Sequence, residues 1–200
     1  MNNKNRKITA IIAVLFDIIL IITSVISVAA RDWKNLLLSL TAILSLKIPF
    51  IFTYFANKKK LSLPNSFQLV AMLFIFSAQY LGEIKGFYIE FWWWDLLLHF
   101  VFGGYVVIVI LNLIQGVIIN NEGITKKQFN LFLVIFAFSF TIALGTLWEM
   151  FEFAGDYLFK TNMIKGGLED TATDLLIKIL AALITSIICY FHNLKSKLDC

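Results

Sequence analysis

Two short segments in the second half of this 200-residue chain place acidic residues at helical spacing. In LWEMFEFAGDY, Glu149, Glu152 and Asp156 stand at i, i+3 and i+7, which puts them on one face of a helix. In WDLLLHFVFGG, Asp95 and His99 are four residues apart and again share a face. Carboxylates and an imidazole gathered in this way can move protons or ligate a divalent metal ion.

A third segment, EDTATDLLIK, adds Asp170, Asp174 and Lys178 at i, i+4 and i+8. The six carboxylates named so far have only Lys178 and His99 to pair with, so some of these carboxyl groups must be protonated or bind a cation. By ligand hardness, oxygens with one imidazole suit Mg²⁺, Mn²⁺ or Ca²⁺, or an iron or zinc ion held by His99 and two acids. A structural zinc site is excluded, because the chain has only two histidines and two cysteines and no H-E-x-x-H motif.

Each pair also has a purely structural interpretation, as a salt bridge or a helix cap, of which Asp174 with Lys178 is one example. This interpretation explains the whole set less well. The three segments give three helices a polar face each, and these faces cannot be exposed to lipid, so they must face one another. The prediction is a shared site at the outer membrane interface. Its candidate catalytic residues are His99, Glu149 and Glu152, and its candidate metal ligands are Asp95, His99, Glu149, Glu152, Asp156, Asp170 and Asp174.

The elements that must position these residues are membrane helices. The chain is 60% apolar and only 15% charged, far from the average of soluble proteins. Pro49 interrupts the second apolar run and predicts a kink. We expect an all-α polytopic membrane helix bundle forming a single integral membrane domain over residues 1–200. Its six transmembrane helices are predicted at about residues 8–30, 36–56, 67–82, 96–115, 129–153 and 171–191.

Basic residues predict the orientation of this bundle. With the N-terminus inside, ten Lys and Arg residues fall in the inner segments and five in the outer segments, so both termini are predicted to be cytoplasmic. The formal charge of +4 then suits anchoring to anionic membrane lipid in the cell inner (plasma) membrane, with no nucleic-acid partner. The sequence does not specify an oligomeric state. The outer side also carries all five tryptophans: Trp33, Trp92, Trp93, Trp94 and Trp148.

The first apolar run follows Lys4, Arg6 and Lys7, a pattern that also suits a cleaved secretory signal. Its length and its central Asp17 favour an uncleaved helix. Lys47 in the second run is level with Asp17, since both lie about 13 to 17 Å deep at 1.5 Å per residue. We therefore expect a structural ion pair between Asp17 and Lys47, and a proton or ion relay is the functional alternative.

The motifs WDLLLHFVFGG, LWEMFEFAGDYLF and EDTATDLL, in this order, resemble the YjdF-like family of bacterial integral membrane proteins, whose function is unknown. The resemblance covers about residues 90–185, and a looser likeness to VanZ-like membrane proteins points toward the cell envelope. The resemblance implies a multi-pass inner-membrane protein. The polar residues that recur in the family correspond here to Asp95, His99, Glu149, Glu152, Asp170 and Asp174.

Three functions remain open at this point. The first is an enzyme that uses a divalent metal ion on a lipid or cell-envelope substrate, with acids at headgroup depth. The second is a small ion-coupled transporter, in which Asp17, Lys47 and Lys178 mark the path. The third is a non-catalytic membrane scaffold or regulator, in which the polar residues only hold helices together.

Overall fold

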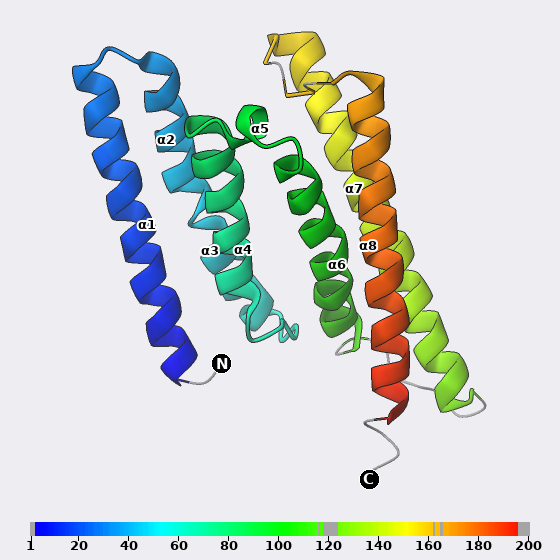
Figure 1. Ribbon diagram of the computed structural model, residues 1–200. Helices are drawn as coiled ribbons and strands as arrows, with labels where there is room; N and C mark the ends of the chain where they lie inside the picture. Colours follow the sequence, from blue (N-terminus) through cyan, green and yellow to red (C-terminus); the bar gives the residue numbers. More distant parts are fainter. Residues whose placement is uncertain (1–2, 116, 118–123, 162, 165, 196–200) are drawn as a thin grey trace. The chain divides into compact units, whose positions relative to one another are not determined.

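The computed structural model describes residues 3–115, 117, 124–161, 163–164 and 166–195, and its regular elements within these ranges are all helices (Figure 1). Six of the helical segments are long and apolar enough to cross a membrane, which confirms the predicted fold class. The six spans are Lys7–Ala29, Trp33–Lys58, Phe67–Ile84, Trp94–Gln115, Lys126–Leu158 and Leu168–His192.

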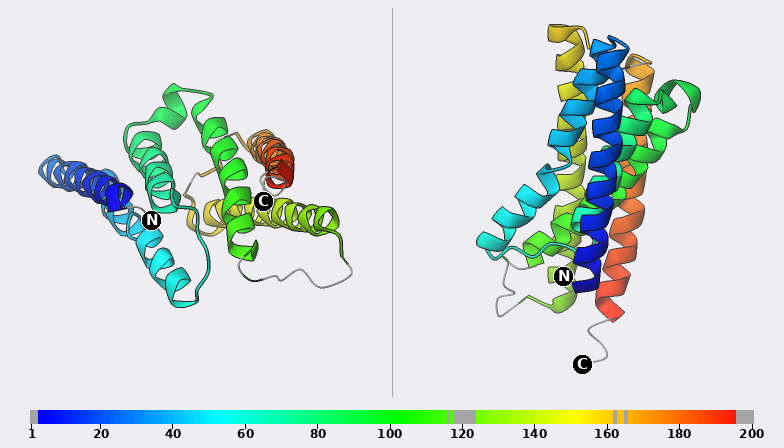
Figure 2. Two further views of the ribbon diagram at one scale, coloured as in Figure 1. Left: turned by 90° about the horizontal axis from the view of Figure 1, so that it is seen from below. Right: turned by 90° about the vertical axis from the view of Figure 1, so that its left-hand side faces the viewer.

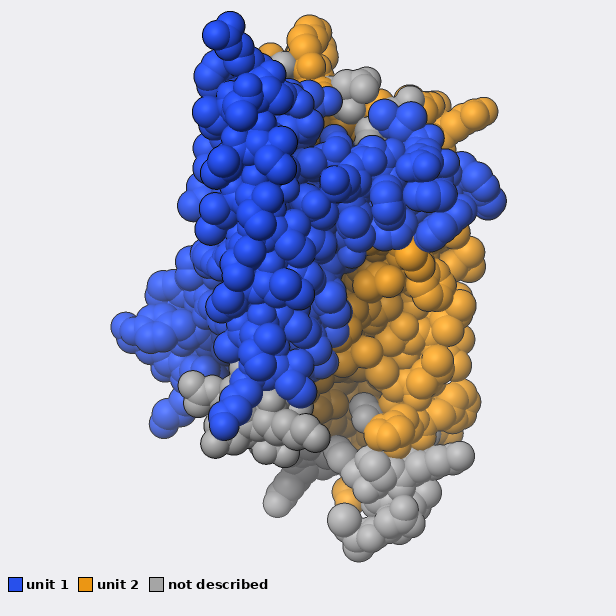
Figure 3. Space-filling model, turned by 60° about the vertical axis from the view of Figure 1, so that its left-hand side comes forward, with its two compact units in different colours: residues 1–94 blue, residues 95–200 orange. Residues whose placement is uncertain are grey.

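The helices fall into two compact units, residues 1–94 and residues 95–200, coloured separately in Figure 3. We call them unit 1 and unit 2. Unit 2 contains α6 (Trp94–Gln115) from Asp95 onward, α7 (Lys126–Phe159) and α8 (Leu168–Lys195). Unit 1 contains α1 (Asn3–Ala29), α2 (Trp33–Ser45), α3 (Ile48–Lys58), α4 (Phe67–Phe76), the π-helix η1 (Ser77–Ile84) and the short α5 (Phe87–Glu90).

The second span of unit 1 is broken between α2 and α3, as Pro49 predicts. Proline lacks an amide hydrogen, so it cannot continue the i to i+4 bonding of α2, and it is tolerated in the first turn of the next helix. The amides of Phe50 and Ile51 instead donate to the carbonyl oxygen of Lys47, each at 3.1 Å. The span therefore turns at Leu46 and Lys47 and resumes as α3.

The core of unit 1 joins α1, α2 and α4. The ring of Phe16 stacks on that of Phe76, with centroids 3.8 Å apart, and Leu20, Leu46 and Met72 are buried beside them. These contacts set the position of α1 along α4, near the middle of the two spans.

In unit 2, α7 and α8 run side by side (Figures 1 and 2). A capping box of Thr125 and Gln128 starts α7 at Lys126, so the helix begins three residues before the predicted 129. It also continues to Phe159, beyond the predicted 153. Apolar residues of α6, α7 and α8 form one core: Val107, Ile110, Leu111, Leu133, Val134, Ala137 and Ala182.

The last helix begins three residues before the predicted 171. The α8 helix begins at Leu168, directly after Gly167, whose φ of 67° is in the left-handed region that glycine adopts without strain. The glycine makes the turn, so Glu169 and Asp170 fall inside the first helical turn, where carboxylates interact favourably with the helix dipole.

Lys165 and Lys197, two of the residues behind the predicted orientation, lie outside the described residues.

Candidate functional site

The polar group of unit 2 begins on α6. Asp95 lies in the first turn of this helix and His99 lies one turn later, which is the spacing that brings two side chains together on a helix face. His99 is buried, and its Nε2 atom is 3.2 Å from Oδ1 of Asp95. At 1.5 Å per residue, His99 lies about 7 Å along the helix from its start.

Asp174 of α8 reaches the same imidazole from the other side. Its Oδ2 atom is also 3.2 Å from Nε2 of His99, and Asp174 is only 2% exposed. Its second oxygen, Oδ1, is buried and has no hydrogen-bond partner among the described residues. One ring nitrogen thus lies between two carboxylate oxygens from different helices.

The ligand atoms of these three residues lie close enough together that they could hold a metal ion. One ligand atom from each of Asp95, His99 and Asp174 lies within 4.8 Å of the other two. Two neighbouring ligand atoms that each lie about 2.1 Å from a metal ion are about 3.0 Å apart in octahedral and about 3.4 Å apart in tetrahedral geometry. The two distances from His99 Nε2 to the carboxylate oxygens, 3.2 Å each, fall in this range. The unpartnered Oδ1 of Asp174 allows that carboxylate to bind through one oxygen or two.

A buried ion pair lies beside this group. Lys178 of α8 donates a hydrogen bond to Oε1 of Glu149 on α7, and these side chains are only 3% and 4% exposed. Lys178 also has a Coulombic interaction with His99, so the pair and the Asp/His/Asp group share one polar region.

Two glycines make room for Lys178. A Cβ added at Gly103 of α6 would lie 2.5 Å from the backbone oxygen of Lys178, and one added at Gly145 of α7 would lie 3.2 Å from its Cδ. Small residues of this kind let membrane helices approach closely. They allow the lysine stem to pass between α6 and α7 toward Glu149.

Glu152 lies at the edge of the same region. It is half-buried, and Nε1 of Trp148 donates a hydrogen bond of 2.9 Å to its Oε1. Coulombic interactions link it to Glu149 and to His99. Glu152 is therefore the carboxylate that an incoming molecule would reach more readily than the buried Glu149.

The last two predicted ligands stand apart from this group. Asp156 accepts hydrogen bonds from the hydroxyl of Thr161 at 2.6 Å and from the amides of Met163 and Ile164 at 2.6 and 2.8 Å. It thereby holds the connection that follows α7. Asp170 lies in the first turn of α8 against Gly166, outside the group of Asp/His/Asp ligand atoms.

Sequence reasoning missed three roles in this region. Local spacing suggested Asp174 as the partner of Lys178, whereas the structure pairs Lys178 with Glu149 on the neighbouring helix. The contribution of Gly145 could have been found, because it stands four residues before Glu149 and so shares its helix face. Trp148 was interpreted only as an interfacial residue, although its indole also orients Glu152.

The predicted ion pair of unit 1 involves different helices. Lys47, in the break between α2 and α3, donates a hydrogen bond to Oδ2 of Asp17 on α1.

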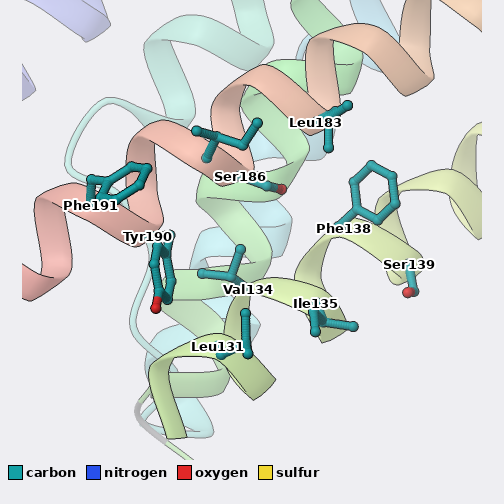
Figure 4. Close-up of a pocket in the computed structure, with 10 residues that line it drawn as sticks. Leu131, Val134, Ile135, Phe138, Ser139, Leu183, Ser186, Tyr190 and Phe191 are labelled. Carbon is teal, nitrogen blue, oxygen red and sulfur yellow. The ribbon is translucent and has the colours of Figure 1, made fainter. Parts of the chain in front are cut away.

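Unit 2 also has an apolar groove of about 460 Å³ between α7 and α8 (Figure 4). Figure 4 shows Leu131, Ile135 and Phe138 on one side and Leu183 and Tyr190 on the other. The groove lies among residues 131–139 of α7 and 183–191 of α8, toward the opposite end of both helices from the polar group. Its lining is almost wholly apolar, so the groove suits a hydrocarbon chain better than a catalytic site.

Fold and site together define an all-helical multi-pass membrane protein with a buried Asp/His/Asp group. The chain belongs to the family described as "Predicted membrane protein (DUF2238)", which matches residues 9–195. It is also 26% identical over 148 residues to a protein of Thermotoga maritima described as an uncharacterized protein, with 71% of this chain and 69% of that protein covered. No solved structure gives a significant match.

Proposed function

We propose that Asp95, His99 and Asp174 bind a divalent metal ion, and that the protein uses this ion on a lipid or lipid-linked cell-envelope substrate in the inner (plasma) membrane. The observation that carries the proposal is the position of His99 Nε2, 3.2 Å from a carboxylate oxygen on each of two helices. The finer resemblance to the YjdF-like proteins rests on the same residues and forms part of this proposal.

The donor set favours a particular group of metals. Two carboxylates and one imidazole suit Mn²⁺, Fe²⁺ or Zn²⁺, because nitrogen and oxygen ligands together are less suited to Ca²⁺, which prefers oxygen alone. Three protein ligands leave positions open for water or substrate, as in catalytic sites and unlike closed structural sites. A metal in such a site polarises a substrate oxygen or lowers the pKa of a bound water.

The neighbouring residues would then have separate roles. Glu152, half-buried and close enough to interact with His99, is placed to act as a general base. Glu149 accepts a hydrogen bond from Lys178, so we assign it a structural role: it balances the charge of the lysine and joins α7 to α8. The indole of Trp148 orients Glu152 and is a side chain that favours the headgroup level of a bilayer.

The depth of the group supports a lipid substrate. Asp95, His99 and Asp174 all lie within about 10 Å of the starts of α6 and α8, at 1.5 Å per residue. The hydrocarbon core of a bilayer is about 30 Å thick, so these residues lie in the outer third of a span and not at its centre. The headgroup is the part of a lipid substrate that lies nearest this depth in the bilayer.

Elemental analysis of the detergent-purified chain tests the metal. We expect about one divalent ion per chain in the wild type, and a metal content at least about tenfold lower in His99→Ala and in Asp174→Asn. Asp170→Asn is the matched control, because it removes a carboxylate on the same helix, one turn from Asp174, that is not one of the three clustered residues. A wild type without metal, or equal metal in His99→Ala, would refute the proposal.

A scaffold role is the second candidate, favoured by the buried pair of Glu149 and Lys178, which joins α7 to α8. It predicts that His99→Ala lowers the melting temperature while the wild type carries no metal. Hydrolysis of radiolabelled membrane lipid by the metal-loaded wild type, absent in Glu152→Gln with its metal retained, would instead favour the enzyme.

A further inference from the structure

The apolar groove of unit 2 contains one buried polar side chain, that of Ser186 on α8. Ser186 lines the groove and is only 4% exposed, and its Oγ atom has no hydrogen-bond partner among the described residues. In Figure 4 this oxygen points from α8 toward α7, on the side where Phe138 lies. A buried hydroxyl without a partner is costly, so this serine indicates a partner that comes from outside the chain.

Other hydroxyl groups on these two helices are satisfied within their own helix. Thr141 and Thr146 of α7 and Thr173 of α8 each donate to the carbonyl oxygen four residues earlier, at 2.8, 3.0 and 2.7 Å. Such a bond is open to any serine or threonine of a membrane helix. The hydroxyl of Ser186 does not make it and so remains able to donate to a molecule in the groove.

The length of α7 places the groove at one boundary of the hydrocarbon core. The helix has 34 residues and is about 51 Å long at 1.5 Å per residue, whereas the hydrocarbon core is about 30 Å thick and takes about 20 residues. A core centred on α7 therefore covers about residues 132–152. The lining of the groove on this helix begins at Leu131, so it starts at the boundary and continues toward the bilayer centre.

A contact between the helices places Ser186 close to the same boundary. The side-chain amide of Asn130 donates a hydrogen bond of 3.2 Å to the carbonyl oxygen of Tyr190, so these two residues are level. Because α7 and α8 run in opposite directions, Ser186 is level with Val134, four residues farther along α7 (Figure 1). The ester carbonyls of a glycerophospholipid, which are hydrogen-bond acceptors, lie near this level.

The same end of α7 carries positive charge. Lys126 and Lys127 are its first two residues, and both are exposed. Lys127 stands four residues before Leu131, so it lies on the helix face that the groove continues. The N-terminus of a helix itself favours phosphate groups, and the first acidic residue of α7 is the distant Glu149. This end is therefore complementary to an anionic headgroup.

We propose that the groove binds one anionic glycerophospholipid of the membrane, separate from any substrate of the polar group. Its phosphate lies at Lys126 and Lys127, one ester carbonyl accepts a hydrogen bond from Ser186, and an acyl chain lies between Phe138 and Leu183 (Figure 4). The volume of about 460 Å³ is within the usual range for ligand sites, about 300 to 1,000 Å³. With the predicted orientation, this lipid belongs to the cytoplasmic leaflet.

The test is native mass spectrometry of the full chain in detergent, titrated with phosphatidylglycerol or with phosphatidylcholine that has the same acyl chains. We expect one phosphatidylglycerol per chain, with an apparent Kd at least about tenfold lower than that for phosphatidylcholine, because two lysines at a membrane surface favour an anionic lipid by at least this factor. Equal affinity for the two lipids would overturn the proposal.

A double variant tests the headgroup contact. Lys126→Met with Lys127→Met should remove the preference, so that the two Kd values agree within about twofold. Lys58→Met with Lys59→Met is the matched control, because it removes an exposed lysine pair at the end of α3 in unit 1, on the side that is also predicted to be cytoplasmic. A preference that persists in the first variant, or that both variants lose equally, would overturn the assignment.

Ser186→Ala tests the ester contact. It should weaken the binding of both lipids by about fivefold and leave the preference unchanged, because both lipids have the same esters. Without lipid the variant should melt no lower than the wild type, since it loses only an unpartnered hydroxyl. Thr146→Val, whose hydroxyl bonds within α7, is the control and should bind both lipids as the wild type does.

Unchanged lipid affinity in Ser186→Ala would overturn this contact. The inference does not depend on a metal ion at the polar group, so the metal content of the same samples reports separately on the proposed function.

Discussion

Lys178→Met tests whether the buried ion pair of unit 2 is what allows Glu149 to remain inside the helix bundle. Methionine keeps most of the aliphatic stem but removes the ammonium group that pairs with Glu149, and Glu149 is 4% exposed. A buried charge that loses its partner destabilises a protein by about 3 to 5 kcal/mol. At about 2 to 4 °C per kcal/mol for a chain of this length, the melting temperature should fall by about 6 to 20 °C.

The double variant Glu149→Gln with Lys178→Met isolates the pair. A neutral amide in place of the carboxylate removes the uncompensated charge, so we expect the double variant to recover most of the loss, to within about 1 kcal/mol of the wild type. The measurement is thermal unfolding of purified protein in one detergent, followed by tryptophan fluorescence. The matched control is Lys127→Met, an exposed lysine on α7, which should change the melting temperature by less than about 2 °C.

Two results would refute this reasoning. If Lys178→Met melts within about 2 °C of the wild type, Glu149 is not held by the lysine. If the double variant is no more stable than the single one, the cost comes from lost packing of the lysine stem between Gly103 and Gly145 and not from the charge.

Three further outcomes are expected. Gly103→Ala should destabilise the chain by about 1 to 3 kcal/mol, because the new methyl group would clash with the backbone of Lys178. Gly104→Ala is the control and should cost less, because its methyl group would meet only a side-chain hydroxyl, at 3.0 Å. Thermal unfolding of the two variants compares them. Asp156→Ala removes the acceptor of three hydrogen bonds and should raise hydrogen exchange in the connection after α7 without changing the metal content, and unchanged exchange would contradict this role. Lys47→Met should lower the melting temperature, and adding Asp17→Asn should restore it; a double variant as unstable as the single one would show that the pairing is not what matters.

Much of this arrangement follows from the sequence, for identifiable reasons. Apolar runs longer than about 18 residues predict spans, because every backbone group in lipid must be bonded internally. Helical spacing predicts that Asp95 and His99 share a face, and depth along antiparallel helices predicts that Asp17 and Lys47 are level. Each of these inferences uses only the spacing within one helix or the depths of residues in two consecutive helices.

Partners across helices could not be predicted in the same way. Helical spacing says which face Lys178 occupies but not which neighbour it meets, so the local partner Asp174 was as reasonable as Glu149 before the packing was known. The helical spacing of Asp156 with Glu149 likewise could not predict that Asp156 accepts hydrogen bonds from the loop after α7, because a side chain near a helix end can also reach the following residues.

The two polar regions share a chemical property that pairing alone does not explain. Each contains an ion pair of a lysine and a carboxylate, Lys178 with Glu149 in unit 2 and Lys47 with Asp17 in unit 1. Among the described residues, the buried side-chain atoms without a hydrogen-bond partner include three carboxylate or amide oxygens, Oδ1 of Asp174, Oδ1 of Asp17 and Oε1 of Gln79, together with Nε1 of Trp94 and Oγ of Ser186. On the function proposed above, the free oxygen of Asp174 is a further ligand atom for the metal ion that Asp95 and His99 would hold, which a purely structural role for this group does not require.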